Sequence, residues 1–296
     1  MITIFKFDAM TKQTINDYIE LTKPRILNMV LVSATLGYFL GGHGKVAFWG
    51  LLWLLIGVSA VCAGSATLNH YLERDSDKKM ARTRNRPIPA GRIPANNALL
   101  FGVALILGGV LFLWLKANLL TAFLSLMSAF LYVLVYTPLK KVSWLHTTIG
   151  AIPGALPPLG GWTAATGEIS LGGWLLFCIL FVWQHPHFYS IAWMFREDYR
   201  AGGFKVLPVV QPDGKSTFRQ ILLYSLLLIP ISVMPTVAGM SGNLYFGGAC
   251  VLGMAMLAQS IVLTRTRTYQ DARNLLKASV IYLPALLLLI VVDRSF

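Results

Sequence analysis

Long apolar runs separated by short polar stretches dominate the pattern of the chain. A helix needs about 20 apolar residues to cross a bilayer core. Nine runs approach this length, near 25–42, 48–72, 97–115, 118–137, 146–163, 172–195, 218–238, 243–264 and 275–293. Glycine and proline interrupt several of them, as membrane helices tolerate. The pattern predicts about nine transmembrane helices, with the fifth kinked or broken by Pro153, Pro157 and Pro158.

Composition supports a membrane protein. Of the 296 residues, 56% are hydrophobic and 12% are charged, whereas a soluble domain carries about 25% charged residues. Met1 to Lys23 is mixed and polar, with no apolar segment before a small-residue cleavage site, so we expect no removed signal peptide. We therefore predict one all-α polytopic membrane domain over 1–296, with 1–24 as its N-terminal segment.

Basic residues alternate with the predicted spans. Twenty-two of the 25 Lys and Arg precede the first span or follow spans two, four, six and eight, and only Lys45, Lys116 and Arg294 fall in the other connections. Such an excess marks cytoplasmic loops. It predicts a cytoplasmic N-terminus and cytoplasmic even-numbered connections. The net charge of +13 thus reflects membrane topology, and we expect no nucleic-acid partner.

The most unusual motif closes the second span. Asn69, Glu73 and Asp77 are spaced four and four, so their oxygens share one face of a helix near its end. Clustered hard oxygens suit Mg²⁺, which bridges one or two carboxylates to substrate phosphates. The cations that follow suit free phosphate oxygens; they are Lys78, Lys79, Arg82, Arg84 and Arg86. The simpler interpretation is a solvated helix end, but Asn69 and Glu73 lie deep enough in the span to be costly without a partner.

A second polar group closes the sixth span, where Arg196, Asp198 and Lys205 again bring acids and bases to the predicted cytoplasmic boundary. The two helix ends are expected to face each other and hold one anionic group. His185 and His187 flank Pro186 about ten residues inside the same span. Buried histidines commonly satisfy structural hydrogen bonds; neutral imidazoles also ligate haem iron or accept protons. The sequence leaves both roles open.

Tyrosines form a third group, in which Tyr132 and Tyr136 precede Lys140. Tyrosine near a membrane boundary is usually an interfacial anchor. The alternative is an aromatic face that stabilises a carbocation. His70 is ambiguous between packing and a site, and His43 and His146 are expected in loops.

Together these groups predict a membrane enzyme with a Mg²⁺–phosphate site at the ends of two helices and an apolar interior for a lipid-like tail. Departure of diphosphate from an allylic prenyl chain fits this arrangement. Metal and cations stabilise the leaving charge, and a dry cavity protects the carbocation from water.

At the level of motifs, Asn69 to Asp77 followed by Met80 to Pro87 resembles the first aspartate-rich motif of the UbiA superfamily of intramembrane prenyltransferases. Three further stretches resemble its haem-modifying branch: Tyr136–Lys140, Trp183–Phe188 and Arg196–Tyr199 with Leu207–Pro208. The similarity runs from Thr22 to about Val210.

The resemblance implies nine helices around a central cavity and a Mg²⁺-dependent transfer of farnesyl from farnesyl diphosphate to the 2-vinyl group of haem b. Water then adds, giving haem O and diphosphate. It implies that Asn69, Glu73 and Asp77 hold the Mg²⁺–diphosphate, and that Asp198, the last aspartate of the second motif, is a further catalytic and metal-binding residue. The candidate substrate-binding residues are Lys78, Arg82, Arg86, Tyr136, Lys140, His185, His187, Arg196 and Lys205. Further implied features are a bacterial inner-membrane location, contact with membrane lipid, and association with haem A synthase or terminal-oxidase assembly.

One departure from the superfamily pattern concerns the second motif. Many members carry two aspartates four residues apart, but the position four before Asp198 is Met194. The sequence therefore leaves open whether a second metal cluster forms, with Glu197 in place of the missing aspartate. The haem-modifying branch shares this departure.

Three alternatives remain at this level. A UbiA-type enzyme with an aromatic or quinone-precursor acceptor would share the metal motif. A phospholipid head-group transferase would carry an Asp-Gly-x-x-Ala-Arg signature, which is absent. A transporter would place its charges near the bilayer midplane, whereas these cluster at one boundary.

Overall fold

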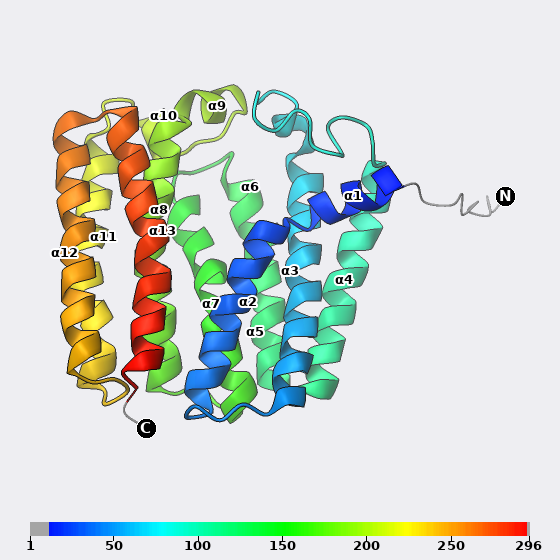
Figure 1. The fold of residues 1–296 in the computed structure, drawn as a ribbon. Helices are drawn as coiled ribbons and strands as arrows, with labels where there is room; N and C mark the ends of the chain where they lie inside the picture. Colours follow the sequence, from blue (N-terminus) through cyan, green and yellow to red (C-terminus); the bar gives the residue numbers. More distant parts are fainter. Residues whose placement is uncertain (1–11, 295–296) are drawn as a thin grey trace.

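The computed structural model describes residues 12–294, and most of these residues form helices joined by turns and loops. Residues 1–11, which hold Lys6 of the predicted N-terminal segment, lie outside this described part. The bundle in Figure 1 consists of α1 (Lys12–Leu21), α2 (Pro24–Gly41), α3 (Phe48–Asp77), α4 (Ala95–Lys116), α5 (Leu119–Phe130), the π-helix η1 (Leu131–Tyr136), α6 (Thr137–Leu139), α7 (His146–Thr166), α8 (Leu171–Met194), α9 (Arg196–Ala201), α10 (Leu207–Val210), α11 (Lys215–Val237), α12 (Asn243–Thr266) and α13 (Tyr269–Val292).

The all-α membrane fold is confirmed, and each of the nine apolar runs corresponds to a long helical segment. Within residues 12–294, seven segments are long and apolar enough to cross a membrane: α3, α4, the continuous segment 119–139, α8, α11, α12 and α13. The other two, α2 and α7, occupy the first and fifth runs and pack against each other.

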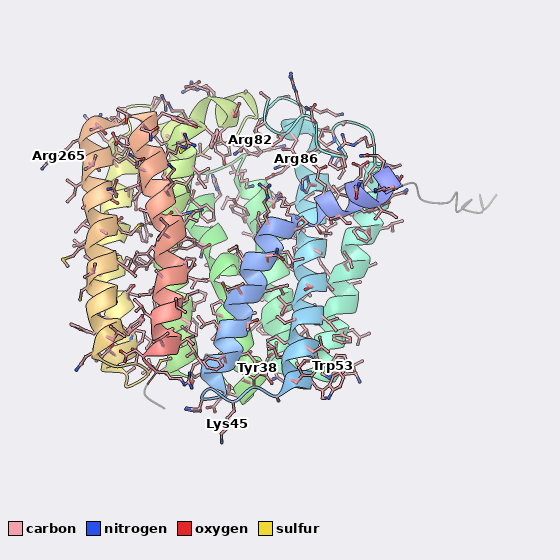
Figure 2. All side chains as sticks on the ribbon, in the orientation of Figure 1. Tyr38, Lys45, Trp53, Arg82, Arg86 and Arg265 are labelled. Atoms are coloured by element: carbon pink, nitrogen blue, oxygen red, sulfur yellow. The ribbon has the colours of Figure 1, made fainter. Side chains whose placement is uncertain are left out.

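Connections alternate between the two ends of the bundle. Figure 1 shows α1, α9, α10 and the connections after α3, α6 and α12 at one end, which we call the site face. Figure 2 places Arg82 and Arg86 at the site face and Lys45 at the opposite end. The connections predicted to be basic therefore share one end of the molecule.

The fifth span was predicted to be kinked or broken, and of these two a break is wrong, because α7 runs from His146 to Thr166 with Pro153, Pro157 and Pro158 inside it. Its neighbour α2 approaches very closely. A Cβ atom added to Gly161 would lie 1.9 Å from the carbonyl oxygen of Ala34, and one added to Gly37 would lie 1.9 Å from that of Pro158. Close support from a neighbouring helix lets a membrane helix tolerate proline.

This contact yields a stability prediction. We expect Gly161→Ala to lower the free energy of unfolding by about 1–3 kcal/mol, because the added methyl forces two backbones apart. Thermal unfolding in detergent measures the change. Gly160→Ala is the control, since nothing lies within 4 Å of its added Cβ. Equal melting temperatures for the two variants would contradict the close packing.

Two apolar clusters meet at α2 and α7. One cluster joins α8 and α11–α13 to Leu40 and Trp162, and the other joins α3, α4 and α5 to Tyr38. At the site face, Met80 from the loop after α3 is buried against Phe204 and Val206 from the loop after α9. The two charged loops that the sequence predicted to face each other therefore pack together, above the end of α3.

Candidate active site

The oxygens of Asn69, Glu73 and Asp77 line one small cavity at the end of α3. Because α3 continues without a break to Asp77, the four-residue spacing keeps all three side chains on one face. Their exposed fractions are only 1%, 5% and 0%. The cavity measures about 200 Å³, and its lining comprises Lys23, Asn69, Glu73, Asp77, Met80, Arg82, Thr83, Arg86, Tyr132, Lys140, Tyr199 and Phe204.

Each of the three oxygen groups contacts a different cation. Lys23 Nζ donates to Asn69 Oδ1 at 2.6 Å, and Lys140 Nζ donates to Glu73 Oε1 at 2.7 Å. One Arg86 Nη donates to both oxygens of Asp77, at 2.8 and 3.0 Å. The cations come from three separate segments, so the tertiary fold assembles the cluster. Buried carboxylates require such partners, because an unpaired one would cost several kcal/mol, roughly 3–5.

The orientation of Asn69 follows from its hydrogen bonds. The hydroxyl of Thr137 donates to the Tyr132 carbonyl at 2.8 Å, so it must accept from Asn69 Nδ2 at 3.1 Å. This assigns the amide oxygen of Asn69 to the side facing Lys23. Thr137 directly follows the π-helix η1, a type of element often found at functional sites.

The pKa values of Lys23 and Lys140 are shifted in opposite directions. Burial by itself would lower the pKa of Lys140, but the carboxylate of Glu73 outweighs it and holds that pKa above its usual range. Lys23 faces a neutral amide, and burial together with the nearby Arg86 lowers its pKa to about 7. Lys23 is therefore the more weakly held cation.

Lys23 also has an unusual backbone. Its φ of 52° lies in the left-handed region, and it immediately precedes Pro24. Both features are unfavourable for a residue with a side chain. Strain of this kind concentrates at functional sites.

Arg82, Tyr132 and Tyr199 line the cavity, and Phe195 and Tyr136 lie next to them without lining it. The Arg82 guanidinium lies 5.0 Å from the ring centre of Phe195 and 5.2 Å from that of Tyr199. Lys140 Nζ lies 4.5 Å from the ring centre of Tyr136, whose ring is 5.4 Å from that of Tyr132. The site therefore combines anionic oxygens, cations and π faces in one small space.

Other predicted residues lie outside the lining of this cavity. Lys78 and Lys205 are exposed, although the backbone N–H of Lys205 donates to the Lys140 carbonyl at 2.7 Å. Arg196 donates to the Trp193 carbonyl at 2.8 Å and stacks on that indole. Asp198 lies in the short helix α9. Among residues 12–294, no three His, Cys, Asp or Glu side chains gather as a metal cluster, so Asp198 does not join Glu73 and Asp77.

The donor set fits Mg²⁺. Two carboxylates and one amide oxygen are hard ligands on a single helix face, and Mg²⁺ is usually held by one or two carboxylates together with substrate phosphates. If protein side chains supplied every ligand, no coordination position on Mg²⁺ would remain for a phosphate oxygen. Asn69, Glu73 and Asp77 are thus the residues that would hold the ion.

The two predicted haem-facing histidines differ in their contacts. His185 is fully buried, stacks on Tyr224 and uses both ring nitrogens, Nδ1 with the Phe181 carbonyl at 2.8 Å and Nε2 with the Thr148 hydroxyl at 3.4 Å. His187 is partly exposed and uses Nδ1 with the Ser279 hydroxyl at 2.8 Å. In the described structure, His187 therefore keeps one ring nitrogen, Nε2, without a hydrogen-bond partner, whereas both ring nitrogens of His185 have partners.

Sequence reasoning missed two residues near this site. Lys23 was counted only for topology, although its place at the start of the first span on the basic side is a usable signal. His146 was predicted in a loop, but it begins α7, is buried, and its ring centre lies 5.7 Å from that of Tyr136. The predicted fifth span already began at residue 146, so the helical position of His146 had a local signal, whereas its burial beside Tyr136 had none.

Comparisons with known proteins agree on one family. A sequence model of the UbiA prenyltransferase family matches residues 30–282. A protein named protoheme IX farnesyltransferase from Solibacter usitatus is 47% identical over 288 residues, covering 94% of this chain and 98% of that protein. One of the same name from Salinibacter ruber is 45% identical over 277 residues, with 94% and 98% covered.

Solved structures share the fold. A digeranylgeranylglyceryl phosphate synthase superposes with a TM-score of 0.78 at 18% identity, covering 95% of this chain and 98% of that one. A UbiA homologue from Archaeoglobus fulgidus, bound to DMAPP and Mg²⁺, superposes with a TM-score of 0.65 at 15% identity, with 93% and 99% covered.

Proposed function

The chain belongs to the UbiA prenyltransferase family, and from this premise we propose that it transfers the farnesyl group of farnesyl diphosphate to the 2-vinyl group of haem b. The cavity at the end of α3 carries the proposal, since its three oxygen groups and its cations suit a metal-bound diphosphate. The relatives named protoheme IX farnesyltransferase support the choice of acceptor.

The reaction breaks the bond between farnesyl C1 and the diphosphate oxygen. A new carbon–carbon bond forms between farnesyl C1 and the terminal vinyl carbon, water adds to the inner vinyl carbon, and one proton leaves. The products are haem O and diphosphate. Mg²⁺ held by Asn69, Glu73 and Asp77 would supply Lewis-acid neutralisation of the leaving diphosphate.

The protein's own cations bind the rest of the leaving group. Lys23, Lys140 and Arg86 already point into the cavity, and Arg82 lines it between two aromatic rings. Each of the first three donates to Asn69, Glu73 or Asp77, and their remaining N–H groups are available to the phosphate oxygens. Such charge-assisted bonds strengthen as negative charge develops. Tyr132, Tyr136 and Phe204 present π faces that favour a cation over water. The more distant Lys78, Arg196, Asp198 and Lys205 remain proposed contributors at the site face.

Lys23 is a proposed diphosphate contact with a measurable effect. We expect Lys23→Gln to raise KM for farnesyl diphosphate about tenfold, because a hydrogen bond to a charged group contributes about 1.5 kcal/mol or more. Steady-state kinetics with varied farnesyl diphosphate give the value. Arg25→Gln is the matched control, since Arg25 is exposed two residues away. A similar KM for both variants would remove Lys23 from the site.

His187 is the proposed haem ligand. The single hydroxyl proton of Ser279 goes to the Leu276 carbonyl at 2.7 Å, so Ser279 accepts from Nδ1–H of His187. The lone pair of His187 then resides on Nε2, the form in which a histidine binds iron while a second group orients its ring. His185 has no such free nitrogen.

Haem titration of variants tests this assignment. We expect His187→Ala to lower haem affinity about tenfold or more and to shift the Soret band, because the axial nitrogen is lost. His185→Gln should leave the band in place. The reverse pattern would assign the iron to His185, and unchanged bands in both variants would exclude ligation by either histidine.

We also propose that the site face is cytoplasmic, in a bacterial inner membrane, because most lysines and arginines lie in its connections. Delivery of the product to haem A synthase or a terminal oxidase stays part of the proposal. The deciding experiment incubates the purified enzyme with haem b, farnesyl diphosphate and Mg²⁺, followed by mass analysis of the haem. A hydroxyethylfarnesyl haem is expected. Unmodified haem, with prenylation of hydroxybenzoate instead, would assign the chain to another branch of the family.

A further inference from the structure

A groove on the outside of the bundle shares no lining residue with the candidate active site. It runs between α11 and α12, which form one edge of the molecule in Figure 1, and has a volume of about 560 Å³. Its basic lining residues, Lys215, Arg219 and Arg267, lie at the site-face ends of the two helices. The rest of the groove is mainly apolar.

Arg267 is held in place at the head of the groove. Its guanidinium lies 5.3 Å from the ring centre of Phe218, and one Nη donates to the Asp213 carbonyl at 3.1 Å. Its own carbonyl accepts from the Trp193 indole at 3.0 Å. The remaining guanidinium donors are free in the described structure. A fixed arginine with free donors loses little entropy when it binds a phosphate.

Arg219 and Lys215 add mobile charge beside it. Both are exposed, and the Asp213 carboxylate forms only a weak ion pair with Lys215, at 3.9 Å. Arg219 forms no ion pair within residues 12–294. The head of the groove therefore carries a clear excess of positive charge.

Apolar side chains continue the groove toward the bilayer interior. Leu222 and Leu226 follow Arg219 along α11 at helical spacing, and Leu257 and Ile261 face them from α12. A cationic head at the membrane boundary above an apolar channel matches an anionic phospholipid, with phosphate at the head and an acyl chain below. A second copy of the chain fits poorly, because a symmetric contact would bring the same cations together.

We propose that this groove is a binding site for one anionic phospholipid of the leaflet at the site face. Its phosphate contacts Arg219 and Arg267, and one acyl chain lies along Leu222, Leu226 and Leu257. Bound lipid also stabilises the end of α8. The carbonyl of Arg267 accepts a hydrogen bond from the indole of Trp193 in α8, and Arg196 of α9 stacks on that indole at 4.5 Å. The site is independent of the proposed farnesyl transfer.

Native mass spectrometry of the delipidated full-length protein tests the site, with phosphatidylglycerol and phosphatidylcholine added at equal concentration. One phosphatidylglycerol is expected to remain bound in preference to phosphatidylcholine. Arg219→Gln should reduce this preference about fivefold, because it removes one of the two guanidinium contacts to the phosphate. Lys215→Gln should reduce it less, because Lys215 lines the groove but is not one of the two phosphate contacts. Both side chains are exposed, so the fold is preserved.

Arg265→Gln is the control, because Arg265 points outward from the same end of α12 (Figure 2) and does not line the groove. It should retain the wild-type preference. Equal binding of the two lipids, an equal loss in Arg265→Gln, displacement of the lipid by one equivalent of farnesyl diphosphate, or a dimer in place of the lipid adduct would each overturn the proposal.

Discussion

Asp77→Asn is expected to lower haem O formation on the order of 100-fold or more. Asp77 is fully buried on the cavity-facing side of α3, and the substitution removes one of two carboxylates while keeping the size of the side chain. Loss of a charge aimed at the leaving group removes transition-state stabilisation of this size. Turnover with saturating haem b, farnesyl diphosphate and Mg²⁺ measures the effect, and calorimetric titration of Mg²⁺ with a non-hydrolysable diphosphate analogue measures binding separately.

Asp75→Asn is the matched control. Asp75 lies on the same helix two residues earlier, but its side chain is exposed and points away from the face shared by Glu73 and Asp77. It should keep near wild-type turnover. If both variants lose activity alike, general electrostatics of the helix end, rather than a metal site, would explain the result. Near wild-type turnover in Asp77→Asn would exclude the metal assignment.

Lys140→Met is expected to affect both stability and catalysis. The lysine is the 2.7 Å partner of buried Glu73, and their side chains are only 16% and 7% exposed. Removing one partner leaves an uncompensated charge, which costs about 3–5 kcal/mol of unfolding free energy. The loss of a diphosphate contact lowers kcat/KM about tenfold or more. Thermal unfolding and steady-state kinetics report the two effects.

A double variant separates them. Lys140→Met with Glu73→Gln removes both charges, so stability should return toward the wild-type value while activity stays low. Lys141→Met is the control, because Lys141 is the exposed neighbour in sequence. Recovery of activity in the double variant would show that the ion pair serves only the fold. An unchanged melting temperature in Lys140→Met would contradict the buried pair.

Apolar periodicity and charge placement were sufficient to predict the helical membrane fold. Each apolar run became a long helical segment because a bilayer-length helix satisfies its own backbone hydrogen bonds, so the signal is local. The clustering of Asn69, Glu73 and Asp77 on one face was also local, since it depends only on helical spacing within α3. The continuity of α7 through three prolines was not local, because it rests on close contact with α2.

By itself, then, the sequence determined the helices, the end of the bundle at which charge gathers, and the shared face of the three oxygen groups. Only the tertiary structure decided which cation meets each oxygen, because Lys23, Arg86 and Lys140 come from separate segments. It also distinguished His187 from His185, since the free nitrogen depends on Ser279 of α13, about 90 residues away in sequence. Local patterns encode helices and their faces, whereas pairings between distant segments follow from how those faces pack.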